Sequence, residues 1–169
     1  CAQVLRLHEC RVTVIGKHRE KLKRLSLLGI DTALRDEVRP EREADIVVDC
    51  TGSPTGIESA LAWLKPRGTL VLKTTVAGSQ TLSLAPLVID EITVIGSRCG
   101  PFERALVALE RQEIDVESLI DGVYPLEDAV AALQTARTQP VLKLLFAVSD
   151  SVEGLSVKRF LAPTRGDVS

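Results

Sequence analysis

Residues 45–75, DIVVDCTGSPTGIESALAWLKPRGTLVLKTT, decide the fold that the sequence predicts. Apolar, β-branched residues typical of a buried strand occupy 44–50, and a similar run occupies 69–75. Between the two runs, four apolar residues recur at the i, i+3, i+4, i+7 spacing of a helix face: Ile57, Ala60, Leu61 and Leu64. The stretch therefore predicts a strand, a helix that ends at the Pro66-Arg67-Gly68 segment, and a second strand.

The same alternation continues on both sides of this stretch. Further strands are predicted over 11–16, 31–34, 91–97 and 141–148. Further helices are predicted over 1–9, 19–28, 84–89, 102–109 and 126–133, with a charged connection over 35–43 and an irregular segment over 116–123. Strands that alternate with helices form a parallel sheet with helices on both faces. Because such sheets bind ligands beyond the carboxyl ends of their strands, the motifs at those ends are the candidate site.

The composition argues against several classes of protein. The 169 residues carry a formal net charge of -2 and only 3% aromatic residues, so neither a basic surface nor a stacking platform for nucleic acid is expected. No apolar run approaches the roughly 20 residues that a membrane span needs. The four cysteines form no CxxC pair, which favours reduced thiols in a cytoplasmic protein over a zinc cage.

Four segments, taken in order, resemble one known family. They are the opening stretch, EITVIGSRCGPF at 91–102, VYPLEDAVAAL at 123–133 and VLKLLF at 141–146. Together they are similar to the carboxyl-terminal half of the medium-chain dehydrogenase/reductase superfamily, the group of zinc-type alcohol dehydrogenases, over residues 1–147. The resemblance implies an α/β fold with a Rossmann-type doubly wound parallel sheet.

The family's dinucleotide domain opens with a strand and a glycine-rich loop of G-x-G-x-x-G type, and the sequence contains neither. We therefore expect residues 1–148 to form a partial NAD(P)-binding domain that lacks a central strand, with carboxyl-terminal elements that rejoin a catalytic domain. Residues 149–169 are polar and unpatterned, and a disordered tail is expected there. The chain starts at Cys1 and holds no methionine, so we expect a fragment that is inactive alone. Substrate contacts and any zinc would then lie in a missing amino-terminal domain.

A basic cluster, Gly16-Lys17-His18-Arg19, follows the strand predicted over 11–16. At this point dinucleotide folds usually place an Asp or Glu that accepts a hydrogen bond from the ribose 2′-OH. Glycine removes the repulsion that an acid would exert on a 2′-phosphate, and Lys17, His18 and Arg19 offer it charge and hydrogen bonds. NADP is thus the expected cofactor and NAD the alternative. A solvated helix start is the second interpretation, although basic residues are unfavourable there.

The resemblance assigns cofactor contacts to residues at the other strand ends. These are Cys50, Thr51 and Gly52 toward the adenosine half, Lys73 and Thr74 on the nicotinamide side, Ser97 and Cys99 toward the carboxamide, and Lys143 toward the pyrophosphate. The simpler interpretation of the first three is a strand-to-helix turn, and that of Lys143 is a lysine facing solvent. No catalytic acid, base or metal ligand is assigned in this sequence.

The function favoured by these observations is that of an oxidoreductase that moves a hydride between NADP(H) and an alcohol or carbonyl substrate. A non-catalytic nucleotide-binding or interaction module derived from the same family is the alternative. A methyltransferase is a third class, but the order and spacing of TGSP and PRGTLVL favour the dehydrogenase. The expected partners are the dinucleotide, the small substrate and a second copy of the chain, to which the strand over 91–97 is a candidate contributor.

Overall fold

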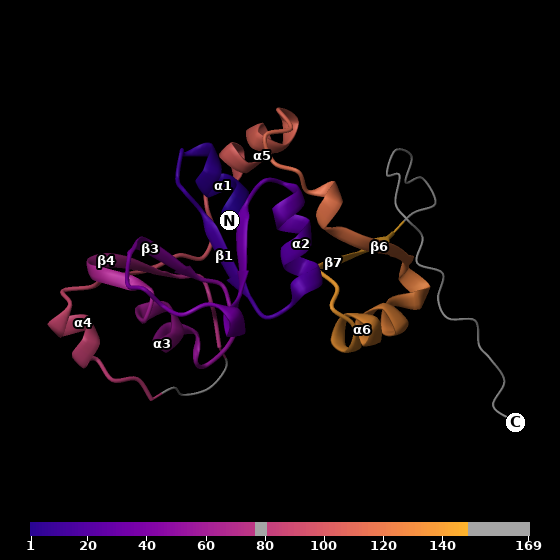
Figure 1. Ribbon diagram of the computed structural model, residues 1–169. Coiled ribbons are helices and arrows are strands. Elements are labelled where there is room, and N and C mark those ends of the chain that lie inside the picture. Colours follow the sequence, from indigo (N-terminus) through magenta and orange to yellow (C-terminus); the bar gives the residue numbers. More distant parts are fainter. Residues whose placement is uncertain (77–80, 149–169) are drawn as a thin grey trace, which may run out of the picture. The chain divides into compact units, whose positions relative to one another are not determined.

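The computed structural model describes residues 1–76 and 81–148 of the chain (Figure 1). The described residues divide into two compact units. The first unit comprises residues 1–38 and 107–148, and the second comprises residues 39–76 and 81–106. The tail predicted over 149–169 lies outside the described residues. Within the described ranges, no helix combines the length and the apolar character that crossing a membrane would require.

The second unit is built on three parallel strands. Its elements in chain order are β3 (Ala44–Asp49), α3 (Gly56–Leu61), β4 (Leu64–Leu72), α4 (Ala85–Ile89) and β5 (Thr93–Gly96). β4 is the central strand, and β3 and β5 each pair with it in parallel. The strand–helix–strand order predicted from the opening stretch is therefore confirmed.

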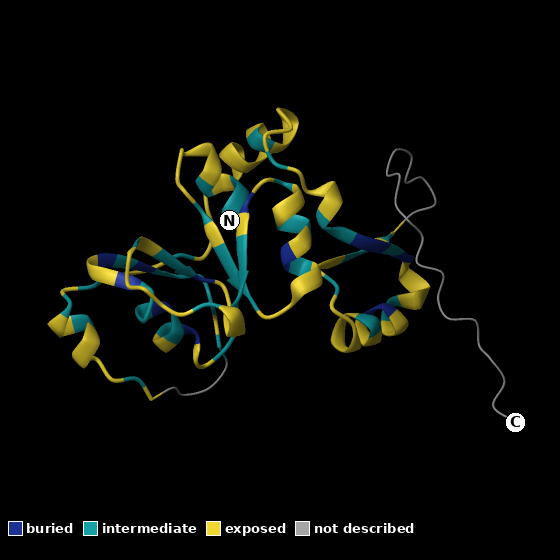
Figure 2. Cartoon of the chain, in the orientation of Figure 1, coloured by how far each residue is buried: buried dark blue, intermediate teal, exposed yellow. Residues whose placement is uncertain are grey.

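The core of the second unit lies between α3 and the central strand. Leu64 and Leu70 of β4 are fully buried, and Ala60 of α3 packs with them. Figure 2 shows buried stretches of the chain in dark blue. Partly buried apolar residues surround this core: Val47, Ile57, Leu61, Leu72 and Ile92. Burying a leucine side chain stabilises a fold by about 1.5–3 kcal/mol, so this small cluster holds the helix against the sheet.

Leu64 belongs to a strand and not, as its spacing predicts, to the preceding helix face. β4 begins at Leu64, which pairs with Ala44. The ladder then shifts register before Ile46 pairs with Thr69, so the Pro66-Arg67-Gly68 segment forms an irregularity inside β4 and not a break between elements. The apolar spacing of Leu64 fits a helix and a strand equally well, and the non-local pairing decides between them.

The first unit contains two separate pairs of parallel strands. The first pair consists of β1 (Thr13–Gly16) and β2 (Asp31–Leu34). Helix α1 (Ala2–Leu7) precedes it, α2 (Arg19–Leu27) connects its two strands, and the short 3₁₀ turn η1 (Arg35–Glu37) follows it. The second pair consists of β6 (Ile120–Pro125) and β7 (Lys143–Ala147). The 3₁₀ turn η2 (Glu117–Leu119) precedes it, and η3 (Leu126–Asp128) and α6 (Ala129–Thr138) connect its two strands. The division between the two units falls within helix α5 (Phe102–Glu110), since the second unit ends at Leu106 and the first resumes at Val107.

The prediction of an irregular segment over 116–123 is wrong in its second half, where β6 begins. This strand contains Asp121 and Gly122, residue types that are depleted in strands. It forms because its backbone pairs with β7, some twenty residues later, and a pattern of local residues does not show that partner. The last helix also begins later than predicted, since residues 126–128 form a 3₁₀ turn before α6.

Every strand pair among the described residues is parallel, and helices alternate with the strands, which confirms the predicted α/β fold. The ladders have the orders β1-β2, β3-β4-β5 and β6-β7. No ladder of the described residues joins β1 to β3.

Candidate cofactor site

The carboxyl ends of β3, β4 and β5 meet at one edge of the sheet in the second unit. Asp49 pairs with Leu72, and Leu72 pairs with Gly96, so the three strands end at the same level. The residues that follow them include seven of the predicted cofactor contacts. These are Cys50, Thr51 and Gly52 after β3, Lys73 and Thr74 after β4, and Ser97 and Cys99 after β5. We call this edge the strand-end rim. The structure thus brings seven of the predicted site residues together.

Thr74 ties the end of β4 to the end of β3. Its hydroxyl donates to the carbonyl oxygen of Asp49 over 3.2 Å and accepts the N–H of Gly52 over 3.1 Å. Gly52 has a φ of 64°, in the left-handed region that glycine adopts without strain. A Cβ built on it would meet nothing within 4 Å, so the rim is open here to the approach of a ligand.

Lys73 ties the end of β4 to the end of β5. Its ammonium lies 3.5 Å from the carbonyl oxygen of Ser97, 3.4 Å from the Ser97 hydroxyl and 3.2 Å from the carbonyl oxygen of Arg98. The backbone supports the same link, because the Ser97 N–H donates to the Leu72 carbonyl over 2.9 Å. Two consecutive residues therefore fasten the central strand to both neighbours.

Asp49, the last residue of β3, is a buried carboxylate that the sequence analysis did not single out. It is 2% exposed, and its Oδ1 accepts the N–H of Thr51 over 2.9 Å. Its Oδ2 has no hydrogen-bond donor among the described residues. Gly56, the first residue of α3, lies so close that an added Cβ would be 2.6 Å from Oδ2 and would also clash with the Thr51 hydroxyl. Only glycine fits between this carboxylate and the start of α3.

The basic cluster lies in the first unit, where β1 gives way to α2. Gly16 is the last residue of β1, and a Cβ there would lie 3.0 Å from Leu22 of α2, so this glycine also serves packing. Lys17 and His18 are exposed, and neither makes an ion pair with a described residue. Arg19 pairs with Glu37 over 2.6 Å at the surface. A phosphate that bound Arg19 would therefore have to compete with a carboxylate.

Lys143 is held by an anchor that the sequence analysis missed. Asp121 of β6 is buried, and its Oδ2 accepts the N–H of Lys143 over 3.2 Å and the N–H of Leu142. The other carboxylate oxygen pairs with Arg24 of α2, which also reaches the Ser118 carbonyl over 3.4 Å. One buried carboxylate thus links α2 to the start of β7. The sequence alone does not reveal this anchor, because a single Asp in a segment predicted to be irregular indicates neither burial nor a pairing with Arg24.

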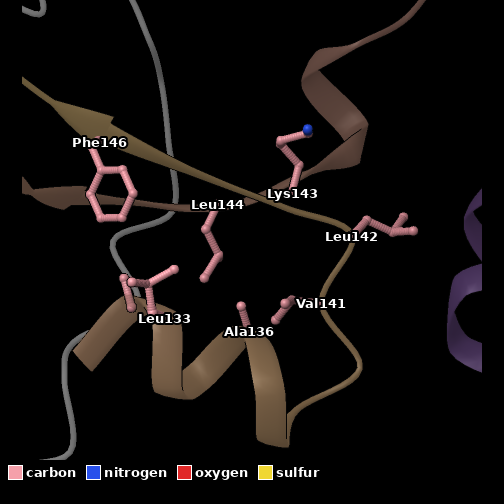
Figure 3. Close-up of a pocket in the computed structure, with 8 residues that line it drawn as sticks. Leu133, Ala136, Val141, Leu142, Lys143, Leu144 and Phe146 are labelled. Atoms are coloured by element: carbon pink, nitrogen blue, oxygen red, sulfur yellow. The ribbon is translucent and has the colours of Figure 1, made fainter. Parts of the chain in front are cut away.

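The side chain of Lys143 points away from α6, whereas those of Leu144 and Phe146 point toward that helix (Figure 3). An open groove of about 280 Å³ lies between α6 and β7. It is lined mainly by apolar side chains, among them Leu133, Ala136, Leu144 and Phe146. Lys143 is itself among the residues that line this groove, and its ammonium is directed away from α6.

The described residues carry His, Cys, Asp and Glu side chains that do not gather into a cluster. They contain no group of three or more His, Cys, Asp or Glu side chains that could hold a metal ion. All four cysteines are free and exposed. The backbone N–H of Ser118 donates to the Asp115 carboxylate over 3.0 Å and lowers the pKa of that group, but Asp115 lies in the loop before η2 and not at a strand end.

A parallel α/β unit whose polar residues and glycines gather at the carboxyl ends of its strands is typical of Rossmann-like domains. The chain belongs to the zinc-binding dehydrogenase family, whose family profile matches residues 1–111.

The chain is also similar to curated dehydrogenases and reductases. The chain is 27% identical over 103 residues to sorbitol dehydrogenase of Mus musculus and 29% identical over 112 residues to D-xylulose reductase A of Aspergillus oryzae. These alignments cover 60% and 64% of this chain but only 29% and 31% of the relatives. The chain therefore spans about a third of the length of the curated relatives it matches.

Solved structures share the fold. A cobalt- and zinc-bound thermostable alcohol dehydrogenase from Pyrobaculum aerophilum superposes with a TM-score of 0.75 at 27% identity, covering 86% of this chain and 45% of that one. Two less similar structures, at 15% and 18% identity, have the same fold: a short chain alcohol dehydrogenase of E. coli CFT073 complexed with NADH, and a dehydrogenase of Sinorhizobium meliloti bound to NADP, with TM-scores of 0.72 and 0.74.

Proposed function

We propose that the chain supplies part of the cofactor-binding region of an alcohol dehydrogenase-like oxidoreductase, which transfers a hydride between a nicotinamide dinucleotide and an alcohol or carbonyl substrate. The strand-end rim of the second unit is the observation that carries this proposal. Membership of the zinc-binding dehydrogenase family supports it, as do relatives whose names state alcohol-oxidising or carbonyl-reducing activities.

The rim fits a dinucleotide in its chemistry. Open space at Gly52 and Gly96 lets a ligand approach the backbone, since a Cβ on either would meet nothing within 4 Å. The bound cofactor would supply the hydride chemistry. At the rim, Gly52, Thr74 and the backbone after Ser97 would hold it. The proposed contact of Lys143, in the first unit, with a phosphate rests on the resemblance to the family.

Zinc is assigned to no residue of this chain, because the described residues lack a ligand set for it. We propose that any zinc and the substrate contacts are supplied by parts of the protein outside this sequence. The chain is accordingly proposed to act within a larger protein and not alone, which agrees with the share of its relatives that it spans.

NADP is the proposed form of the cofactor, with Lys17 as the main contact to its 2′-phosphate. Lys17 is exposed and unpaired among the described residues, Gly16 adds no acidic side chain, and His18 offers a ring nitrogen. Arg19 contributes less, because Glu37 already holds its guanidinium. A charge-assisted hydrogen bond is worth about 1.5–3 kcal/mol, so Lys17 is expected to favour NADPH over NADH by roughly tenfold or more.

A fluorescence titration of the full-length protein with NADPH and NADH tests this. The Lys17→Ala variant is expected to bind NADPH roughly tenfold more weakly and NADH as before, since NADH has no 2′-phosphate. Lys23→Ala is the matched control, because Lys23 is an exposed lysine of α2, the helix that follows Lys17, and lies beyond the first turn of that helix. Tighter binding of NADH than of NADPH, unchanged in Lys17→Ala, would contradict the NADP assignment. Dinucleotide binding without turnover of any alcohol or carbonyl would instead favour a non-catalytic nucleotide-binding module.

A further inference from the structure

The ammonium of Lys73 is the strongest candidate for a role that the proposed function does not yet include. An ammonium has three N–H donors and no acceptor. Three oxygens of the loop after β5 surround it at 3.2–3.5 Å: the carbonyl and hydroxyl oxygens of Ser97 and the carbonyl oxygen of Arg98. Every donor of Lys73 therefore has a partner, and none is left for a substrate.

The contacts of Lys73 also determine where the neighbouring N–H groups point. In a trans peptide the C=O and the following N–H point in opposite directions. Because Ser97 and Arg98 turn their carbonyl oxygens toward the ammonium, the N–H groups of Arg98 and Cys99 face away from it. Neither N–H donates to another residue in the described part of the chain. Two adjacent backbone donors are thus left free at the end of β5.

We propose that Lys73 is a positioning residue, which holds the backbone of Ser97 and Arg98 so that the N–H groups of Arg98 and Cys99 can donate to an amide or phosphate oxygen of the dinucleotide. The inference rests on the proposed function. It assigns Lys73 no contact with the substrate and no proton transfer. Thr74 performs the corresponding task on the other side of β4, where its hydroxyl joins Asp49 and Gly52.

The Lys73→Met variant tests the proposal, because methionine keeps most of the length of the side chain and removes the charge and the donors. Hydrogen–deuterium exchange of the full-length protein without cofactor gives the first measurement. The Ser97 amide, which donates to Leu72, is expected to exchange about five- to twentyfold faster once the ammonium no longer holds this loop. Lys65→Met is the matched control, since Lys65 lies on β4, the strand that Lys73 directly follows, and pairs with Asp45 at the surface.

Cofactor binding gives the second measurement. The dissociation constant of NADPH is expected to rise by about five- to twentyfold in Lys73→Met, while Lys73→Arg recovers most of the affinity because it retains a cation with several donors. The turnover number of the Lys73→Met variant at saturating cofactor is expected to have the same pH profile as that of the wild type, since Lys73 moves no proton.

Unchanged exchange at Ser97 in Lys73→Met would overturn the proposal. A lost turnover number with unchanged cofactor affinity would also overturn it, because that result would make Lys73 a catalytic residue. If the wild-type protein bound no dinucleotide, the proposed function would fail, and the exchange of Ser97 would still decide whether Lys73 holds the loop.

Discussion

Replacing Gly56 by alanine tests how closely α3 approaches the end of β3. The added Cβ would clash with the Thr51 hydroxyl and would lie 2.6 and 2.8 Å from the two oxygens of Asp49. Separations below about 3.0 Å force atoms to move, and the buried Asp49 carboxylate has little freedom to do so. Gly56 has no positive φ, so the change would otherwise stabilise the helix through the better propensity of alanine.

The magnitude follows from these two opposing effects. Overpacking a tight site costs typically 1–3 kcal/mol. The contact with a buried carboxylate lies at the upper end of that range, whereas the helix propensity of alanine returns up to about 1 kcal/mol. We therefore expect Gly56→Ala to lower the free energy of unfolding by about 2 kcal/mol.

Urea unfolding followed by the fluorescence of Trp63, the single tryptophan of the sequence, measures this loss in the second unit. A slope of roughly 1–3 kcal/mol per molar urea converts 2 kcal/mol into a midpoint lower by about 1 M. Gly100→Ala is the matched control, because a Cβ on Gly100 would meet nothing within 4 Å. The double variant Thr51→Ala/Gly56→Ala should recover part of the loss, since it removes the nearest oxygen. A Gly56→Ala protein as stable as the wild type would refute the reasoning.

Two further predictions concern buried side chains. Asp121→Asn removes the charge that holds Arg24 and the backbone of Leu142 and Lys143, and because Arg24 is 35% exposed we expect a loss of about 2–3 kcal/mol, below the full 3–5 kcal/mol of a buried pair. Glu37→Gln, which breaks an exposed pair, is the control, and an equal effect of both variants in thermal unfolding would argue against the anchor. Leu64→Ala is expected to cost about 3–4 kcal/mol in the same assay, because Leu64 is fully buried in the core of the second unit. A cost below 1 kcal/mol would show that this core does not hold α3 to the sheet.

The sequence predicts the strand alternation and the strand-end rim because both follow from local patterns. Apolar runs such as those at 44–50 and 69–75 mark strands, and parallel pairing then brings their carboxyl ends to one edge of the sheet. The glycines and polar residues directly after the strands could therefore be chosen as site residues from the sequence.

The sequence does not predict features that depend on distant partners. The sequence does not predict β6, because Asp121 and Gly122 are poor strand formers. The strand depends on its pairing with β7 and on Arg24, and both are far away in the sequence. Leu64 is assigned to the wrong element because its pairing with Ala44 is non-local. The ion pair between Arg19 and Glu37 likewise joins residues 18 positions apart, so the competition for a phosphate at Arg19 becomes visible only in the structure.

Hydrogen–deuterium exchange of the full-length protein with and without NADPH tests the central claim most directly. If the strand-end rim holds the dinucleotide, the backbone amides of Gly52, Arg98 and Cys99 slow their exchange on addition of NADPH, and the amides along the exposed face of α6 do not. Protection confined to other parts of the chain, with the amides of the rim unchanged at saturating NADPH, would contradict the account.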